Sequence, residues 1–334
     1  MSIIILYIGP MISDKNKTRT TSTLVEAADA GKRLDAYLSE RFTYLSRTEW
    51  QSHIRDARIL LNGGKSRSSR KLQSGECIEF LADDIEEPPV DGKYGVVYSD
   101  ESLIVVSKSG NLPCHPAGPF FKNTLWYLLA EEFGKVYFIN RIDRETSGLV
   151  LLARKPEIAA EMSERHSEIR KKYVVFVHGE FPAEYHARGF LMPDGKSAVR
   201  KKRRFAESAK PPSVNSEYAE TKFRLLGTGS GMSVVEAELV TGRLHQIRAT
   251  LCSLGFPLAG DKIYGRDENI YIRFVRDEMT DADRLLLVLN RQALHAASLE
   301  ISHPLTGKLL SCKAELPDDM RILLTGFSQK HIDI

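Results

Sequence analysis

The sequence has no long hydrophobic run. A membrane-spanning helix needs about 18 or more consecutive apolar residues, and even the apolar stretches at 149–153 and 285–289 are enclosed by charged or polar residues. The apolar stretch 3–8 is short and has neither a preceding basic residue nor a small-residue cleavage site, so it does not resemble a signal peptide. We therefore expect a cytoplasmic protein that does not engage a membrane.

Cysteine is scarce. The four cysteines, Cys77, Cys114, Cys252 and Cys312, lie far apart, with no CxxC pair and no histidine at zinc-finger spacing. We expect reduced thiols and no metal site, which is the usual state of a cytosolic protein.

Neither charge sign is in large excess over the whole chain. The 334 residues carry a net charge of +3, with 42% hydrophobic and 27% charged residues. This composition excludes wholesale disorder and a fibrous repeat, and the length suggests about two domains.

The charge is distributed unevenly along the chain. Residues 31–75 hold ten Lys and Arg against four Asp and Glu, whereas residues 76–91 hold seven acids and no base. A second basic zone, residues 165–204, holds eleven bases against four acids. Two local basic surfaces favour a polyanionic partner, although the second zone could equally be a solvated loop. That zone ends in a run of five bases, Arg200, Lys201, Lys202, Arg203 and Arg204.

The N-terminal part of the chain indicates a flexible tail over residues 1–22 and a small domain over 23–85. A first helix is expected from apolar residues at helical spacing, namely Leu34, Tyr37, Leu38 and Phe42. Ser46 and Glu49 form a capping-box pair that begins a second helix. Short strands are expected at 59–61 and 77–80, with a turn at 62–64 and a basic loop at 65–71 between them.

The second helix is expected to be amphipathic. Its buried side is marked by Trp50, Ile54 and Ala57, and its polar stripe by Arg47, Gln51, Arg55 and Arg58. These arginines, with Lys71 in the basic loop, would present a positive face to a phosphate backbone. The stretches 31–35 (GKRLD), 45–47 (LSR) and 60–63 (LLNG) resemble the small RNA-binding domain named after ribosomal small-subunit protein S four.

An acidic, proline-containing linker over residues 86–93 leads to a second domain at 94–334. Its most informative stretch is 136–154, in which two apolar strands enclose a polar connection. There Asp143 lies between Arg141 and Arg144, whose charges favour its ionised form. From residue type alone, an aspartate that ties down the turn is the more favoured interpretation, and a nucleophilic carboxylate is the alternative.

The order of motifs favours the nucleophile. Residues 141–148 (RIDRETSG) resemble the signature HRLDRxTSG of the RluA-type family of RNA pseudouridine synthases. Further stretches resemble that family in the same order: 171–179 (KKYVVFVHG), 240–248 (VTGRLHQIR), 256–261 (FPLAGD), 294–296 (LHA) and 303–304 (HP). The resemblance covers about residues 94–320.

The resemblance implies an α+β protein: a small two-helix-plus-sheet RNA-binding domain, then a larger mixed, mainly antiparallel β-sheet with flanking helices. It implies isomerisation of uridine to pseudouridine in ribosomal or transfer RNA, without metal or organic cofactor. It assigns Asp143 as the catalytic aspartate, Tyr173 as the tyrosine against the flipped base, and Arg243 as the arginine that pairs with the aspartate. The resemblance also implies that the side chain of Arg141 fills the gap left in the base stack when the target uridine flips out.

Some points depart from the family pattern or stay open. Asn140 stands where the family has histidine, and regions 186–215 and 266–291 look divergent.

The expected partner is RNA. Arg144 and the bases of the run 200–204 are expected to contact it. No protein partner is expected, since one site per chain requires no dimer.

Three alternatives were weighed. A non-catalytic RNA-binding protein with a degenerate synthase domain is disfavoured by the intact Asp143, Tyr173 and Arg243. A glycosidase needs a second carboxylate, for which Glu145 is the nearby candidate. A nuclease would show a metal-binding acid cluster or a histidine pair, and neither motif is present in the sequence.

Overall fold

The computed structural model describes residues 19–42, 46–82 and 87–327. The chain divides between Pro88 and Pro89 into two compact units, and residues 116–121 cluster with the first. Within the described ranges, no helix is both long enough and apolar enough to cross a bilayer.

The first unit is a four-stranded antiparallel sheet with two helices, in the order β1-β4-β2-β3. Its elements are β1 (Arg19–Leu24), the short 3-10 helix η1 (Ala27–Asp29), α1 (Leu34–Arg41), α2 (Arg47–Arg55), β2 (Ile59–Leu61), β3 (Gly64–Lys65) and β4 (Cys77–Ala82). The two helices and the strands at 59–61 and 77–80 were expected from the sequence. The tail was expected to reach residue 22, but β1 begins at Arg19 and pairs with β4; residues 1–18 lie outside the described ranges.

Helix α2 begins with the capping box that the sequence predicts, because Ser46 and Glu49 each bond the other's backbone amide. Trp50 and Ile54 are buried in the core of this unit. The helix ends at Arg55, so the prediction that Ala57 and Arg58 continue its two faces is wrong. Ala57 has a positive φ of 56°, which turns the chain into β2.

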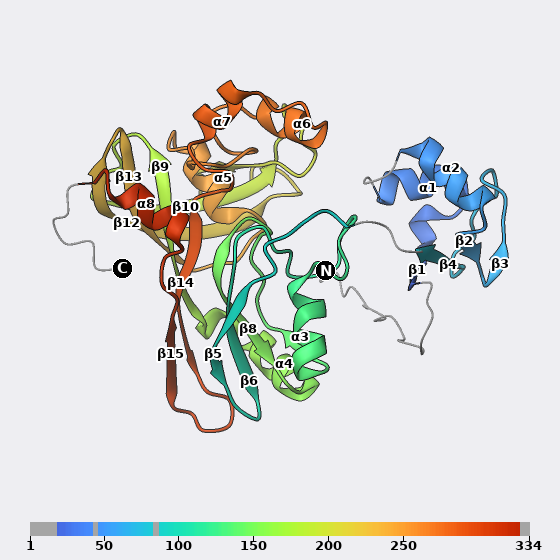
Figure 1. Cartoon of the computed structure of the whole chain (residues 1–334), viewed down its shortest axis with the longest axis horizontal. Helices are drawn as coiled ribbons and strands as arrows, with labels where there is room; N and C mark the ends of the chain where they lie inside the picture. The colour runs from blue at the N-terminus through green and yellow to red at the C-terminus, as the bar shows by residue number, and fades with distance from the viewer. Residues whose placement is uncertain (1–18, 43–45, 83–86, 328–334) are drawn as a thin grey trace. The chain divides into compact units, whose positions relative to one another are not determined.

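The second unit is built on an eleven-stranded mixed sheet in which only the described pair β8 and β14 is parallel. The strand order is β11-β10-β12-β13-β9-β14-β8-β6-β5, and β15 and β7 pair with β14 and β8. This is the α+β architecture that the family resemblance implies (Figure 1). The strands are β5 (Tyr94–Ser99), β6 (Leu103–Lys108), β7 (Tyr137–Phe138), β8 (Ser147–Ala153), β9 (Arg170–His178), β10 (Glu184–Pro193), β11 (Arg203–Ala206), β12 (Glu217–Gly229), β13 (Met232–Leu239), β14 (Leu294–Ser302) and β15 (Leu309–Lys313).

The second unit also contains helices, and some of them cover each face of the sheet. They are α3 (Leu125–Phe133), α4 (Pro156–Glu164), η2 (His166–Glu168), α5 (Gln246–Ser253), α6 (Asn269–Val275), α7 (Asp281–Leu287) and α8 (Asp318–Leu324). Alternate residues of β9 enter two different cores: Tyr173 and Val175 join the larger one, which includes residues of α3, α4 and α5. Val174 and Phe176 join a smaller one with Met320 of α8. The period-two alternation of a strand explains this division.

Gly148, the last residue of the 141–148 motif, allows β8 and β14 to approach. Its φ is +106°, and a Cβ there would lie 2.3 Å from the carbonyl oxygen of Ala296. A side chain would therefore force apart the parallel pair on which the site is built.

The two divergent regions form ordered structure. Region 186–215 contains the paired strands β10 and β11, and region 266–291 contains α6 and α7, which lie side by side (Figure 1). Arg273 joins the two helices, because its guanidinium contacts Asp267 at 3.0 Å and Asp283 at 2.6 Å.

Candidate functional site

Asp143 lies in the loop that leads from β7 into β8. The buried ammonium of Lys108, at the end of the neighbouring strand β6, donates to the carbonyls of Arg144 at 3.1 Å and Thr146 at 2.6 Å. Burial lowers the pKa of Lys108 to about 8. The buried side chain of Lys108 thus holds the loop around Asp143 in place through two backbone carbonyls.

The carboxylate of Asp143 accepts hydrogen bonds from two side chains that come much later in the chain. Arg248 Nη1 lies 2.7 Å from Oδ2, and Gln292 Nε2 lies 3.4 Å from the same oxygen. His245 Nε2 stands 4.0 Å from Oδ1. The aspartate side chain is nevertheless 29% exposed, so the carboxylate is held from one side and open on another.

Arg248 is shared between two carboxylates. It is 7% exposed, and its Nε and Nη2 bond Asp261 at 2.6 and 2.9 Å in a bidentate pair. Asp261 is fully buried and also accepts the amides of Ile263 and Tyr264. Burial alone would raise the pKa of Asp143, but the charge and hydrogen bond of Arg248 hold that pKa below its usual value.

The prediction that Arg243 pairs with Asp143 is wrong. The Arg243 side chain is 44% exposed, its Nε donates to the carbonyl of Tyr218 at 3.1 Å, and its Nη1 lies 4.0 Å from Glu217. Arg243 precedes α5, whereas Arg248 lies on the buried side of that helix. The arginine of the same motif that contacts the aspartate is therefore the one five residues later.

Tyr173 is buried on β9 among small residues of the neighbouring strands. In the register of the sheet it lies opposite Ala296 of β14 and Ala237 of β13, and Ala296 lies opposite Gly148 of β8. Directly paired residues share a face, so the tyrosine ring has small neighbours on both sides. Burial, then the charge of Asp143, raises the pKa of Tyr173, which is the opposite of what a general base needs.

The residues next to Asp143 in the motif differ in their exposure to solvent. Arg141 is exposed, and Arg144 is partly exposed. Asn140 is buried, and its Oδ1 accepts a hydrogen bond from the amide of Leu151 at 2.6 Å, which ties the loop to β8.

His115, which precedes α3, lies near the same loop. Its ring centroid is 4.2 Å from that of Phe138, and burial and the charge of Arg141 lower the pKa of His115 to about 4.

The expected RNA-contact arginines of the first unit are only partly available. Arg47 and Gln51 both donate to the buried carboxylate of Asp35, at 3.1 Å and 2.7 Å, so these members of the polar stripe have an internal partner. Arg55 is exposed and bonds Ser52 on its own helix.

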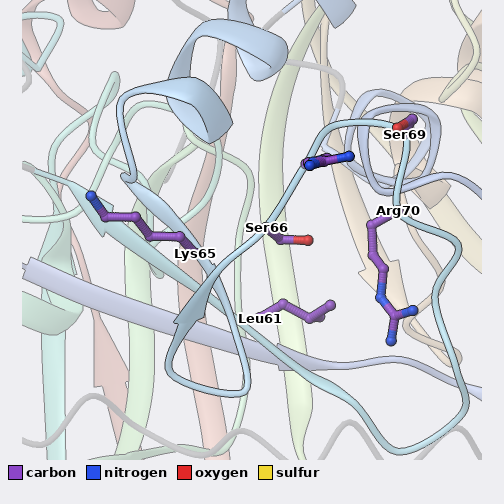
Figure 2. A pocket seen from close by; sticks show the side chains of 6 residues that line it. Leu61, Lys65, Ser66, Ser69 and Arg70 are labelled. Carbon is purple, nitrogen blue, oxygen red and sulfur yellow. The ribbon is translucent and has the colours of Figure 1, made fainter.

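The basic loop of the first unit borders a surface pocket of about 470 Å³. Side chains of Lys65, Ser66 and Arg70 surround it in Figure 2. Lys65 and Arg70 are exposed, and Arg70 also contacts Glu76 at 3.0 Å. Lys71, the loop residue expected to contact RNA, is exposed as well.

The run 200–204 is divided between surface and interior roles. Lys202 is 15% exposed and pairs with Glu268 at 2.5 Å, so it has an internal partner, and its expected contact with RNA stays a prediction. Arg203 begins β11 and is partly buried, whereas Arg200, Lys201 and Arg204 are exposed. Besides burial, the charge of Lys201 is one of the influences that lower the pKa of His245.

Sequence reasoning missed several residues of this site. Arg248 and Asp261 lie within the motif stretches, but no role was assigned to them, and Gln292 and Lys108 were not singled out. The available signal was a charged residue surrounded by apolar ones: Arg248 follows Ile247 and precedes Ala249, and Lys108 follows the apolar strand 103–106.

The chain matches known proteins over both units. Residues 102–253 match the family described as RNA pseudouridylate synthase. An uncharacterised RNA pseudouridine synthase of Bacillus subtilis is 30% identical over 309 residues, covering 88% of this chain and 93% of the relative. Ribosomal large subunit pseudouridine synthase D of Nitrosomonas europaea is 28% identical, covering 88% and 84%, and that of Neisseria meningitidis is 30% identical, covering 89% and 79%.

The fold is also found in a solved structure. Human RNA pseudouridylate synthase domain containing 1 superposes with a TM-score of 0.55 at 21% identity, covering 72% of this chain and 91% of the human one. Fold and sequence together define an isomerase that acts on RNA. The chain belongs to the RluA-type family of RNA pseudouridine synthases.

Proposed function

We propose that Asp143 is the group that makes and breaks a covalent bond during the isomerisation. The observation that carries this proposal is a carboxylate bonded by Arg248 on one side and 29% exposed on the other. The reaction breaks the bond between N1 of uracil and ribose C1′ and forms one from C5 to C1′; C5 loses its proton and N1 gains one. An ionised carboxylate can serve as a nucleophile and leaving group toward C1′ or the ring, or can take a ribose proton to give a glycal.

The reacting uridine would be flipped out of its helix or loop, because its reacting atoms are hidden when it is stacked. Arg141 is exposed and two residues from Asp143, which suits its planar guanidinium to fill the place that the base leaves. Tyr173 would lie against the flipped ring in its neutral form. Its raised pKa argues against a role as the acceptor of the C5 proton.

The substrate that we propose is structured ribosomal RNA of the large subunit. Two relatives that cover most of this chain carry that substrate in their names, and this favours ribosomal over transfer RNA. The first unit, with the exposed bases of loop 65–71, would bind the RNA backbone. Such an enzyme would work in the cytoplasm and needs no protein partner for its single site.

The test is release of tritium from RNA labelled at uracil C5. The wild-type chain should release tritium from large-subunit ribosomal RNA prepared from cells that lack the gene, and mapping should locate the pseudouridine formed. Asp143→Asn should abolish release, because an amide is a poor nucleophile, while the affinity for RNA stays within about twofold. Glu101→Gln, on an exposed acid between β5 and β6, is the control and makes the same carboxylate-to-amide change.

Two results would contradict the proposal. Normal release by Asp143→Asn would remove the aspartate from the mechanism. Absence of release by the wild-type chain from both ribosomal and transfer RNA, with RNA still bound, would favour the non-catalytic alternative.

A further inference from the structure

Helix α6, in the divergent region, lies against the loop that carries Asp143. The ring centroid of Phe274 is 5.9 Å from the guanidinium carbon of Arg144 and 4.9 Å from Nζ of Lys262. Arg144 follows Asp143 directly, and Lys262 follows Asp261 and pairs with Glu145 at 2.8 Å. The ring thus belongs to the immediate surroundings of the site.

The ring of Phe274 is partly open to solvent. Ile270, one turn earlier, is the buried residue of α6, whereas Phe274 is 37% exposed. An exposed aromatic ring beside cations has the composition of a single-strand nucleic-acid site, in which bases stack on rings and basic groups attract phosphates.

The helix that carries this ring is held in place from two sides. Arg273, the preceding residue, joins α6 to α7 through Asp283. Glu268, at the start of α6, accepts bonds from Ser197 and Lys202 of the other divergent region. A fixed ring loses little conformational entropy when a base stacks on it, so these ion pairs favour binding.

We propose that Phe274 is a stacking platform for a nucleobase that flanks the target uridine, and that Arg144 faces the adjoining phosphate. This inference rests on the proposed function, because it assumes an RNA with its reacting uridine at Asp143. Stacking recognises a planar base with little regard to its identity. The enzyme would accordingly require an unpaired nucleotide beside the target and would tolerate any of the four bases there.

The test compares full-length variants on a fluorescein-labelled RNA hairpin with a single loop uridine. The two nucleotides that flank the uridine are replaced one at a time by an abasic residue. Phe274→Ala should weaken binding of the intact hairpin by roughly 5- to 150-fold, and Phe274→Trp should restore it. On the hairpin that lacks the stacked base, Phe274→Ala and the wild-type chain should bind equally. Val275→Ala, at a 65% exposed neighbour on the same helix, should bind every hairpin like the wild-type chain.

Two outcomes overturn the stacking proposal: equal binding of the intact hairpin by Phe274→Ala and the wild-type chain, or an equal loss on both abasic hairpins. Binding is measured without turnover, so the result does not depend on tritium release. Failure of release with a base-dependent effect of Phe274→Ala would refute the proposed function and leave the stacking site standing.

Discussion

The guanidinium of Arg248 contacts two carboxylates, of which Asp261 is fully buried and Asp143 is partly open. Asp261 fixes the fork of the arginine through two bonds and leaves Nη1 for Asp143. A lysine could not reproduce this geometry, because an ammonium has no rigid fork. The charge state and direction of the Asp143 carboxylate therefore depend on a buried arginine that need not touch RNA.

We predict that Arg248→Gln lowers kcat roughly 100- to 1,000-fold, as the loss of one preorganised donor does elsewhere. Without the arginine, only His245 and Gln292 still oppose the effect of burial, so the pKa of Asp143 rises relative to wild type. The remaining rate should therefore fall as the pH drops from 7 to 5.5, because less of the carboxylate is ionised. The wild-type rate should show no such fall, since its pKa lies below the ordinary value. Tritium release across this pH range is the measurement.

Arg243→Gln is the matched control, because it removes an exposed arginine of the same motif. Its kcat should stay within a few-fold of wild type, and Arg248→Lys should recover only part of the rate. A large loss of kcat with Arg243→Gln and none with Arg248→Gln would restore the pairing expected from the sequence.

The motifs indicate two candidate site residues but not the side chains that contact them. Asp143 and Tyr173 were identifiable because they stand in short, ordered strings. Arg243 and Arg248 stand in one string, and which of them faces Asp143 depends on where α5 begins and on which side it buries. Where α5 begins, and which side of it is buried, depends on packing against strands that are distant in the sequence. The nine-residue motif 240–248 does not contain that information.

At the scale of elements, the site depends on the close parallel pairing of β8 and β14. His295 and Ala296 lie opposite Ser147 and Gly148, and His295 Nδ1 lies 2.9 Å from Ser147 Oγ. The pair brings the loop of Asp143 next to Gln292, just before β14. A change in the spacing of these strands would therefore move Gln292 relative to the carboxylate of Asp143.

We predict that Gly148→Ala destabilises the second unit by roughly 3 kcal/mol or more, because the new methyl group would meet the backbone of Ala296 at a positive φ. Urea unfolding measures this change. Gly95→Ala on β5 is the control, since nothing lies within 4 Å of a Cβ there, and it should change stability by less than about 1 kcal/mol. Equal effects of the two substitutions would contradict the close-approach argument.

Elements with clear apolar periodicity were predicted well, and those without it were not. Helices α1 and α2 and strands β2, β4 and β8 follow runs that the sequence identifies. Strand β1 is rich in threonine and serine and was taken for a tail. Helices α6 and α7, of seven residues each, depend on Arg273 and its two acids rather than on a long apolar stripe.

At the scale of the whole molecule, the two units are expected to divide binding from chemistry. The bases of loop 65–71 belong to the first unit, and Asp143 with its partners belongs to the second. The charge pattern of the sequence predicted a basic first part, but not that Arg47 is engaged by Asp35. Solvent exposure, which sequence does not give, selects Lys65, Arg67 and Lys71 as the bases to test.

We predict that replacing Lys65, Arg67 and Lys71 together by alanine weakens RNA binding and lowers the slope of log affinity against log salt by roughly 2. The kcat at saturating RNA should not change, because Asp143 and its partners are untouched. Alanine at Arg170, Lys308 and Lys313, three exposed bases of the second unit, is the control and should keep the wild-type slope. An unchanged slope in the loop variant would show that the backbone is bound elsewhere.

The hydrogen bonds of Asp143 come from Arg248 and Gln292, which follow it by 105 and 149 residues. Both partners are therefore synthesised long after the whole of the first unit. The first unit can fold while the carboxylate of Asp143 still lacks both hydrogen bonds, so the geometry of the candidate site is completed only after residue 292 has been added to the chain.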